Sequence, residues 1–230
     1  MKKNARIILS ILLFIFVIGS YFISDFNYEE DNNKVSYTSA DIPAYNGDYY
    51  ITLNNNEPEF DDSEYTTTSF EEYSDLDDLG RCGTAYANVS TDTMPTTKRE
   101  SIGMIKPTGW HTIRYDDLID GKYLYNRCHL IAYMLTGENA NEKNLITCTR
   151  HMNASVMLEF ENKVADYVHS TGNHVLYRVT PYFEGNNLLA TGVQMEAASV
   201  EDSTIRFNVF VYNVQDGIEI DYSNGDSHIS

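Results

Sequence analysis

Arg127 and His129 stand two positions apart in a segment rich in aromatic and aliphatic residues, positions 123–133. In an extended strand alternate side chains share a face, which places the guanidinium and the imidazole about 7 Å apart on one side. A histidine with its ordinary pKa can take a proton from water at neutral pH, and a guanidinium matches two phosphate oxygens. The pair suits phosphodiester chemistry, and structural roles for both residues are the alternative.

A second set of polar side chains lies on a predicted helix. Apolar residues recur at three- and four-residue spacing from 153 to 171, and Gly172 predicts the stop. Glu161 falls within the apolar stripe, where a carboxylate is costly unless it is paired, protonated or close to a cation, and an ordinary ion pair with an arginine is the simple alternative. Asn153 begins the same face, as an N-cap or as a ligand. Their Cα atoms would be about 12 Å apart, so one could bind Mg²⁺ directly and the other through water.

The elements that carry these residues alternate between strands and a single strong helix. Strand-like composition occurs at 84–90, 123–134, 175–183, 188–197 and 205–213. Short strands with one helix between them predict an α+β fold, in which an antiparallel-rich sheet packs against the helix.

The N-terminus has the layout of an export signal. Lys2, Lys3 and Arg6 precede an apolar run from 7 to 23, which predicts a cleaved signal peptide or a membrane anchor over residues 1–24. A helix of that length spans about 25 Å, near the lower limit for a bilayer, so both forms stay open. In either case the rest of the chain lies outside the cytoplasm.

The net charge of −18 is unevenly distributed. Residues 25–78 hold 16 acidic side chains and one basic side chain, which predicts an acidic, mostly disordered linker over 25–79. A solvated spacer is the simple interpretation of it, and a polyanion that competes with substrate is the other. A globular domain is expected over 80–222, followed by a tail at 223–230. Because a −18 protein repels phosphate in bulk, any nucleic-acid binding requires a local basic cleft and weakens as salt rises.

Three motifs together resemble the DNA/RNA non-specific endonuclease family. They are Asn-Arg-Cys-His-Leu at 126–130, Gly-Glu-Asn-Ala-Asn-Glu-Lys-Asn-Leu-Ile-Thr at 137–147, and Met-Asn at 152–153 with Glu161 eight residues later. The resemblance is strongest to the streptodornase-like and DNA-entry-nuclease branches. It implies a ββα-metal nuclease fold over about residues 80–222. It also implies a secreted or membrane-anchored bacterial enzyme that hydrolyses DNA, and RNA, to 5′-phosphate products without sequence preference.

The resemblance also assigns roles to individual residues. His129 matches the general base, and Asn153 matches the one direct protein ligand of Mg²⁺, for which Mn²⁺ can substitute. Glu161 matches the carboxylate that orients metal-bound water, Arg127 the phosphate-binding arginine, and Asn144 a supporting residue. No protein partner is implied, and the apolar run at 7–23 is a candidate membrane tether.

Two positions depart from the family motif Asp-Arg-Gly-His. Asn126 replaces the Asp and could still orient a partner through hydrogen bonds. Cys128 replaces the Gly, and strand alternation turns it away from the face of His129. A nucleic-acid-binding or DNA-uptake module with weakened chemistry is therefore the alternative function. The odd cysteine count predicts one disulfide and one free thiol, and we take Cys82 with Cys128 as the pair.

The expected basic cleft draws on eight side chains. We favour Arg150, three residues before Asn153, and Arg178, on a predicted strand, as substrate-binding residues beside Arg127. Trp110 and the tyrosines are candidates for stacking on bases. The full set of candidate cations is Arg81, Lys98, Arg99, Lys106, Arg114, Arg127, Arg150 and Arg178.

Overall fold

A computed structural model describes residues 37–38 and 40–230 of the chain. The expected signal or anchor at 1–24, with its tether at 7–23, lies outside these residues. Within the described ranges, no helix is both long and apolar enough to cross a bilayer.

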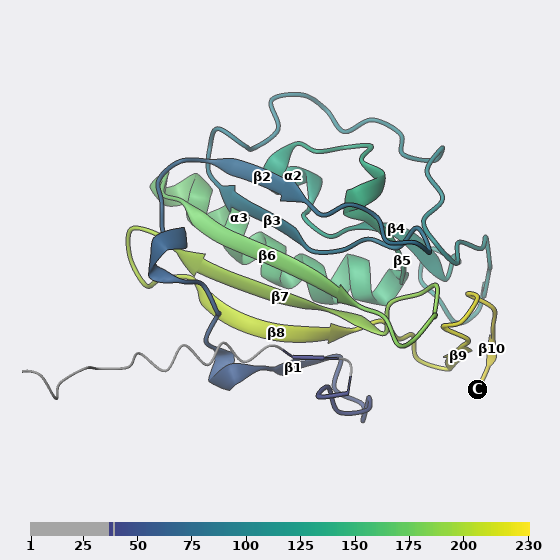
Figure 1. The fold of residues 1–230 in the computed structure, drawn as a ribbon. Coiled ribbons are helices and arrows are strands. Elements are labelled where there is room, and N and C mark those ends of the chain that lie inside the picture. Colours follow the sequence, from purple (N-terminus) through teal and green to yellow (C-terminus); the bar gives the residue numbers. More distant parts are fainter. Residues whose placement is uncertain (1–36, 39) are drawn as a thin grey trace, which may run out of the picture. The chain divides into compact units, whose positions relative to one another are not determined.

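A six-stranded antiparallel sheet forms the centre of the fold (Figure 1). Its strands in spatial order are β1 (Tyr50–Thr52), β8 (Arg206–Tyr212), β7 (Gly192–Ser199), β6 (Val175–Tyr182), β3 (Ala85–Val89) and β2 (Phe70–Tyr73). Four of the five predicted strand segments become strands of this sheet. Their alternate residues, such as Tyr177 and Val209, are buried in one apolar core.

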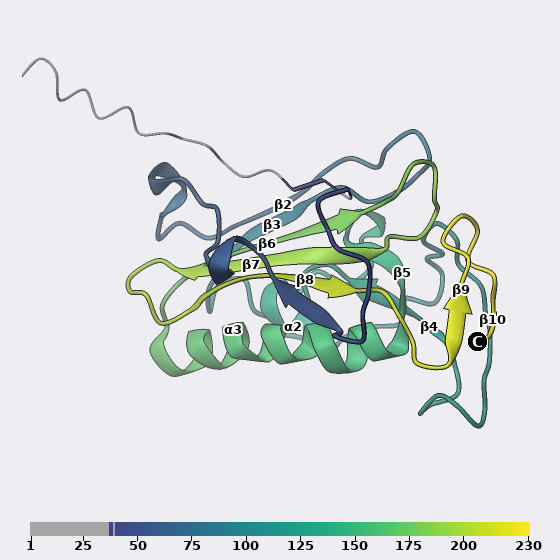
Figure 2. The ribbon, with the colours of Figure 1, turned by 90° about the horizontal axis from the view of Figure 1, so that it is seen from below.

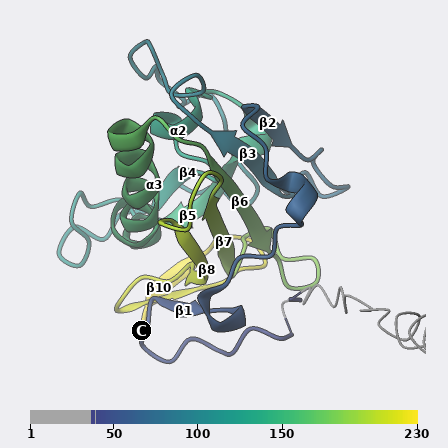
Figure 3. The same cartoon turned by 90° about the vertical axis from the view of Figure 1, so that its left-hand side faces the viewer.

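The main helix, α3 (Leu158–Thr171), covers one face of this sheet (Figures 2 and 3). Phe160, Val164 and Val168 are buried in the same core as the strand residues. The expected three- and four-residue period is therefore confirmed, and the helix ends as predicted at Gly172, whose φ of 74° is the left-handed conformation that glycine adopts most easily.

A separate hairpin leads into this helix. Strands β4 (Tyr125–His129) and β5 (Leu145–Thr149) pair in antiparallel fashion. The loop between them contains the short helix α2 (Tyr133–Thr136) and a 3-10 turn, η3 (Glu142–Asn144). A π-helical turn, η4 (Met152–Met157), joins β5 to α3. The predicted strand at 123–134 is thus shorter than expected and gives way to α2.

The acidic segment is not a disordered linker up to residue 79. It contributes β1, β2 and two 3-10 turns, η1 (Asn54–Asn56) and η2 (Asp62–Glu64), to the domain. Its acidic side chains pair with arginines of the sheet: Glu57 lies 2.6 Å from Arg206. Its aromatic Phe60 stacks on Tyr86. A count of charges does not show which acidic side chains pair with arginines. The domain boundary expected at residue 80 therefore lies too far along the chain.

The C-terminal residues are also structured. Strand β9 (Ile218–Ile220) pairs with β10 (Ser227–Ile229) in a small antiparallel sheet. The expected tail at 223–230 is therefore part of the domain.

The disulfide joins Cys128 to Cys148, and the expected pair of Cys82 and Cys128 is wrong. In the β4–β5 register Asn126 lies opposite Cys148, so Cys128 is two positions along on the same face, with 5.9 Å between the two Cα atoms. That spacing is normal for a disulfide. Cys82 is a buried free thiol that donates to the carbonyls of Glu142 and Leu145.

Candidate active site

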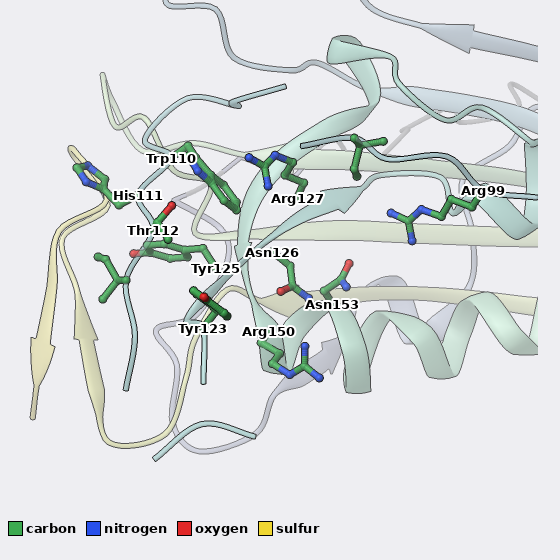
Figure 4. Close-up of a pocket in the computed structure, with 12 residues that line it drawn as sticks. Arg99, Trp110, His111, Thr112, Tyr123, Tyr125, Asn126, Arg127, Arg150 and Asn153 are labelled. Atoms are coloured by element: carbon green, nitrogen blue, oxygen red, sulfur yellow. The ribbon is translucent and has the colours of Figure 1, made fainter. Parts of the chain in front are cut away.

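A pocket of about 510 Å³ lies where β4 meets the π-helical turn (Figure 4). Its polar lining comes from β4, from the start of the helix and from the long loop before β4, and includes Arg99, Asn126, Arg127, Arg150 and Asn153. Three of these side chains are arginines, and no acidic residue of the described chain lines the pocket. The acidic protein therefore carries a local cationic cleft.

His129 is buried behind the wall of this pocket, with 5% of its surface exposed. Its Nε2 lies 2.8 Å from the carbonyl oxygen of Asn139. Because a carbonyl only accepts hydrogen bonds, Nε2 carries the proton and Nδ1 has the free lone pair. Burial, opposed by the hydrogen bond to the Asn139 carbonyl and assisted by the charge of Arg99, lowers the pKa of His129 to about 4. The imidazole is therefore neutral at pH 7 and has one defined basic nitrogen.

Asn144 holds the chain that follows His129. Its side-chain oxygen accepts from the Ile131 backbone N–H at 2.9 Å, and its amide donates to the Ile131 carbonyl at 3.0 Å. Its own carbonyl accepts from Leu130. Asn144 is fully buried and lies outside the pocket lining. It fixes the end of the strand that carries His129 and makes no part of the pocket surface.

Asn153 and Asn126 project toward each other in the pocket (Figure 4). Within the described chain, neither side-chain amide forms a hydrogen bond. Asn153 lies in the π-helical turn, which the apolar period did not predict. In a regular α-helix, eight residues leave two side chains about 80° apart around the axis. A π turn needs more residues per turn, which brings Asn153 and Glu161 closer to one face.

Glu161 is buried on that face, with 7% of its surface exposed. Burial raises the pKa of its carboxyl to about 8, although the charge of Arg99 opposes the shift. Within the described chain, no ion pair or hydrogen bond compensates this carboxylate. The expected ion pair with an arginine is therefore not found: the raised pKa favours the protonated carboxyl, and Arg99 acts on it only through its charge.

Glu161→Gln should stabilise the metal-free protein as pH rises. Because the pKa is higher in the folded state than in the unfolded state, the wild type loses stability between about pH 4.5 and pH 8, at roughly 1.4 kcal/mol per pH unit. Glutamine has the same shape and no such loss. Urea unfolding in EDTA at about pH 5 and pH 8 measures the difference.

Glu159→Gln is the matched control, since Glu159 is an exposed carboxylate of α3 that pairs with Lys163. It should leave the pH dependence of unfolding as it is in the wild type. Equal stability of wild type and Glu161→Gln at both pH values would contradict the raised pKa of Glu161.

Arg127 lines the pocket and lies on β4, two positions before His129. Its guanidinium stacks on Trp110, with 3.9 Å from Cζ to the ring centroid. Nε donates to the Ile105 carbonyl, and Nη2 donates to the Gly103 carbonyl at 3.0 Å. Two of its five N–H donors therefore hold the loop that carries Trp110. The two residues occupy alternate positions of one strand, as the sequence predicted, and the hydrogen bonds of the Arg127 guanidinium go to the loop before β4.

The two favoured cleft arginines differ in position. Arg150 lines the pocket beside Asn153 and packs closely on Gly121. Arg178 lies elsewhere and is a correction to the expected site. It forms an ion pair with Glu196 at 2.9 Å, and its guanidinium stacks on Phe60. Its charge is neutralised by Glu196 of β7 and, at 3.8 Å, by Glu64 of the acidic segment that was expected to be a linker.

Arg99 is the site residue that sequence reasoning did not single out. Its Nη2 lies 3.3 Å from Nδ1 of His129, and it lines the pocket. It belongs to the irregular loop between β3 and β4, where no periodicity indicates a direction for its side chain. It was one of eight candidate cations, and only the folded chain distinguishes it.

The donor set of the pocket fits a hard divalent cation. Amide and carboxylate oxygens suit Mg²⁺ or Mn²⁺, which keep several waters and need few protein ligands. The two amides of Asn126 and Asn153 are free to accept such an ion or its waters, and the buried Glu161 carboxylate would be favoured in its charged form by it. In the part of the chain that the structure describes, no cluster of three His, Cys, Asp or Glu side chains offers a zinc-type site.

A β-hairpin that leads into a helix, with a buried histidine on the hairpin and an asparagine at the helix start, is the ββα-metal nuclease fold. The chain belongs to the DNA/RNA non-specific endonuclease family, which its sequence matches over residues 62–201. That match begins before the boundary expected at residue 80.

Similar proteins of known structure include streptococcal nucleases. NucA from Streptococcus agalactiae with magnesium ion bound is 25% identical, with a TM-score of 0.70 over 78% of this chain and 87% of that chain. Sda1 nuclease with bound zinc ion is 26% identical, with a TM-score of 0.65 over 79% and 96%. A deoxyribonuclease of Streptococcus dysgalactiae subsp. equisimilis is 33% identical over 108 residues, which is 45% of this chain and 32% of that protein. The chain thus matches about a third of the length of that relative.

Proposed function

We propose that the chain is an exported, divalent-metal-dependent endonuclease that hydrolyses DNA, and RNA, without sequence preference. The observation that carries the proposal is a neutral, oriented His129 whose basic nitrogen meets Arg99 at the wall of a cationic pocket. A pocket lined by guanidiniums and amides grips phosphate and metal. It reads no base edges, so sequence preference should be low.

His129 acts as the general base. Its Nδ1 takes a proton from water while the water oxygen forms a bond to phosphorus, and the carbonyl of Asn139 holds the ring through Nε2–H. In the free protein Arg99 occupies that lone pair. An incoming phosphate is a better partner for the guanidinium, so substrate binding frees Nδ1. The bond from phosphorus to the 3′ oxygen breaks, the 3′ oxygen is protonated from solvent, and the phosphate stays on the 5′ end.

The remaining polar residues bind and orient the reacting groups. Mg²⁺ or Mn²⁺, held at Asn153, would supply charge stabilisation for the phosphate and the leaving oxygen. Glu161 orients water in that site, and Asn126 offers a second amide beside Asn153. Arg150 lies in the same lining and adds positive charge for the substrate phosphate.

The two departures from the family motif leave this chemistry in place. Asn126 lines the pocket, so its side-chain amide supplies an oxygen where the family motif has an aspartate, but without the negative charge. Cys128 is bonded to Cys148 within the hairpin and takes no part in the pocket surface. Both observations favour an enzyme over the binding or DNA-uptake module on the same fold.

Nicking of supercoiled plasmid DNA tests the function. The protein should convert supercoiled to open-circular DNA in Mg²⁺ or Mn²⁺, and EDTA should abolish this activity because the site would lose its charge stabilisation. A parallel assay on RNA decides the breadth of the substrate range. Activity that persists in EDTA would contradict the mechanism, and a folded protein that binds DNA without nicking it would favour the uptake module.

Export is supported by two features of different kind. The basic and apolar N-terminus matches a signal peptide or a membrane anchor. The Cys128–Cys148 disulfide is typical of a protein that matures in an oxidising compartment. We therefore place the enzyme outside the cytoplasm, either secreted or tethered to the outer face of the plasma membrane through residues 7–23.

A further inference from the structure

The active-site pocket is larger than a phosphate and its metal require. Its volume of about 510 Å³ falls in the range of pockets that enclose whole small molecules. Beyond Asn126 and Arg127 the lining changes from cationic to aromatic (Figure 4). This aromatic end consists of Trp110, His111 and Tyr123, and the proposed mechanism does not use it.

The aromatic end is held in place before any substrate arrives. Trp110 is fixed by the stacked guanidinium of Arg127, whose N–H groups also hold the loop. The Arg114 guanidinium lies 5.3 Å from the ring centroid of Tyr123 and is itself paired with Asp116. Tyr123 nevertheless remains 45% exposed. Rigid aromatic faces that stay accessible lose little entropy when a planar group stacks on them.

We propose that the aromatic end of the pocket is a nucleobase subsite, which receives the base of a nucleotide next to the scissile phosphate. The inference rests on the proposed nuclease function and adds the form of its substrate. A base inside a duplex is stacked on its neighbours and cannot enter a pocket unless it leaves the helix. The subsite therefore selects single-stranded or locally unpaired nucleic acid, while any base is accepted because each has a π face.

Binding can be measured without catalysis, because Trp110 is the only tryptophan of the chain. Intrinsic fluorescence of the full-length protein in EDTA should be quenched by a short single-stranded oligothymidylate. An abasic oligonucleotide of the same length keeps the phosphates and lacks the bases, so it should bind about tenfold more weakly and leave the fluorescence nearly unchanged. Equal affinity and equal quenching for both oligonucleotides would overturn the proposal.

Tyr123→Ala identifies the residue that stacks. Its Kd for the base-bearing oligonucleotide should rise about tenfold, and Tyr123→Phe should restore the wild-type value because the ring is kept. The loss from removing the ring and the loss from removing the base should not add, as expected for two groups in contact. Additive losses would mean that Tyr123 acts elsewhere than on the base.

Tyr45→Ala is the matched control, since Tyr45 is also a partly exposed tyrosine and lies outside this pocket. It should leave both Kd values unchanged. Plasmid nicking in Mg²⁺ separates the two hypotheses. A protein that nicks DNA but does not distinguish base-bearing from abasic strands lacks the subsite, whereas one that distinguishes them without nicking lacks the proposed activity.

Discussion

Replacing His129 with alanine lowers kcat/KM for plasmid nicking by about 10²–10⁴-fold, the range that a positioned general base contributes. The expected loss is large because His129 is the proposed proton acceptor, whereas the imidazole that lines the pocket, His111, lies at its aromatic end. The residual activity reflects phosphate binding by Arg99 and Arg150 and the bound metal. The variant should keep its affinity for Mg²⁺, which isothermal titration measures.

The pH profile is a second readout of the same assignment. Because burial lowers the pKa of His129 to about 4, wild-type kcat/KM should hold on the acid side to well below pH 6. Above that pKa the ring is neutral and able to accept a proton. His228→Ala is the control, since His228 is exposed and pairs with Glu219. An acid limb near pH 6.5, or full activity of His129→Ala, would exclude His129 as the base.

Much of the fold could be predicted because local periodicity determines it. The apolar period of α3 and the strand-like composition of β6 and β8 are short-range patterns, and each element formed near its expected position. The π-helical turn could not be predicted in this way. It follows the end of β5, where the backbone N–H of Met152 donates to the Thr149 hydroxyl. Nothing in the period of 153–171 indicates that hydrogen bond.

The errors share one physical cause, which is long-range pairing of charges and thiols. The acidic segment was expected to be disordered because its charges repel one another in an extended chain. In the fold Glu57 pairs with Arg206 and Glu64 pairs with Arg178, and the partners of each pair are more than 100 positions apart in the sequence. The same contacts remove Arg178 from the list of substrate-binding side chains. The disulfide partner depends on the register of β4 with β5, which a count of cysteines does not contain.

The part of the candidate site that lies on predicted elements could be found from the sequence, and the part that lies on an irregular loop could not. Three pocket residues lie on or next to elements that the sequence predicts, and they meet in one pocket: Asn126, Arg150 and Asn153. Arg99 comes from an irregular loop 30 residues before His129, and its approach to Nδ1 is a tertiary contact. The proposed base, His129, and the proposed metal ligand, Asn153, are each tested by a variant of their own.

Asn153→Ala should remove metal-dependent activity. Losing an oxygen ligand should raise the Mg²⁺ concentration at half-maximal nicking by about 100-fold or more, because few other ligands in the pocket compensate. At a fixed, moderate Mg²⁺ concentration, kcat/KM should fall by at least about 10²-fold, since the charge stabilisation of the phosphate is lost. Titrating Mg²⁺ in the nicking assay measures the first quantity directly.

Two further variants separate ligation from structure at Asn153. The structure places the N-cap at His151 and Asn153 inside the helical turn, so the N-cap alternative for Asn153 is wrong. Asn153→Asp keeps an oxygen at the same position and should recover part of the metal-dependent activity, whereas a purely structural defect would show equally in the absence of metal. Asn162→Ala removes an exposed asparagine of the same helix and should behave as the wild type. If Asn153→Ala kept the wild-type Mg²⁺ midpoint, the ion would have to bind elsewhere, and the free amide facing Asn126 would be a structural feature of the helix start.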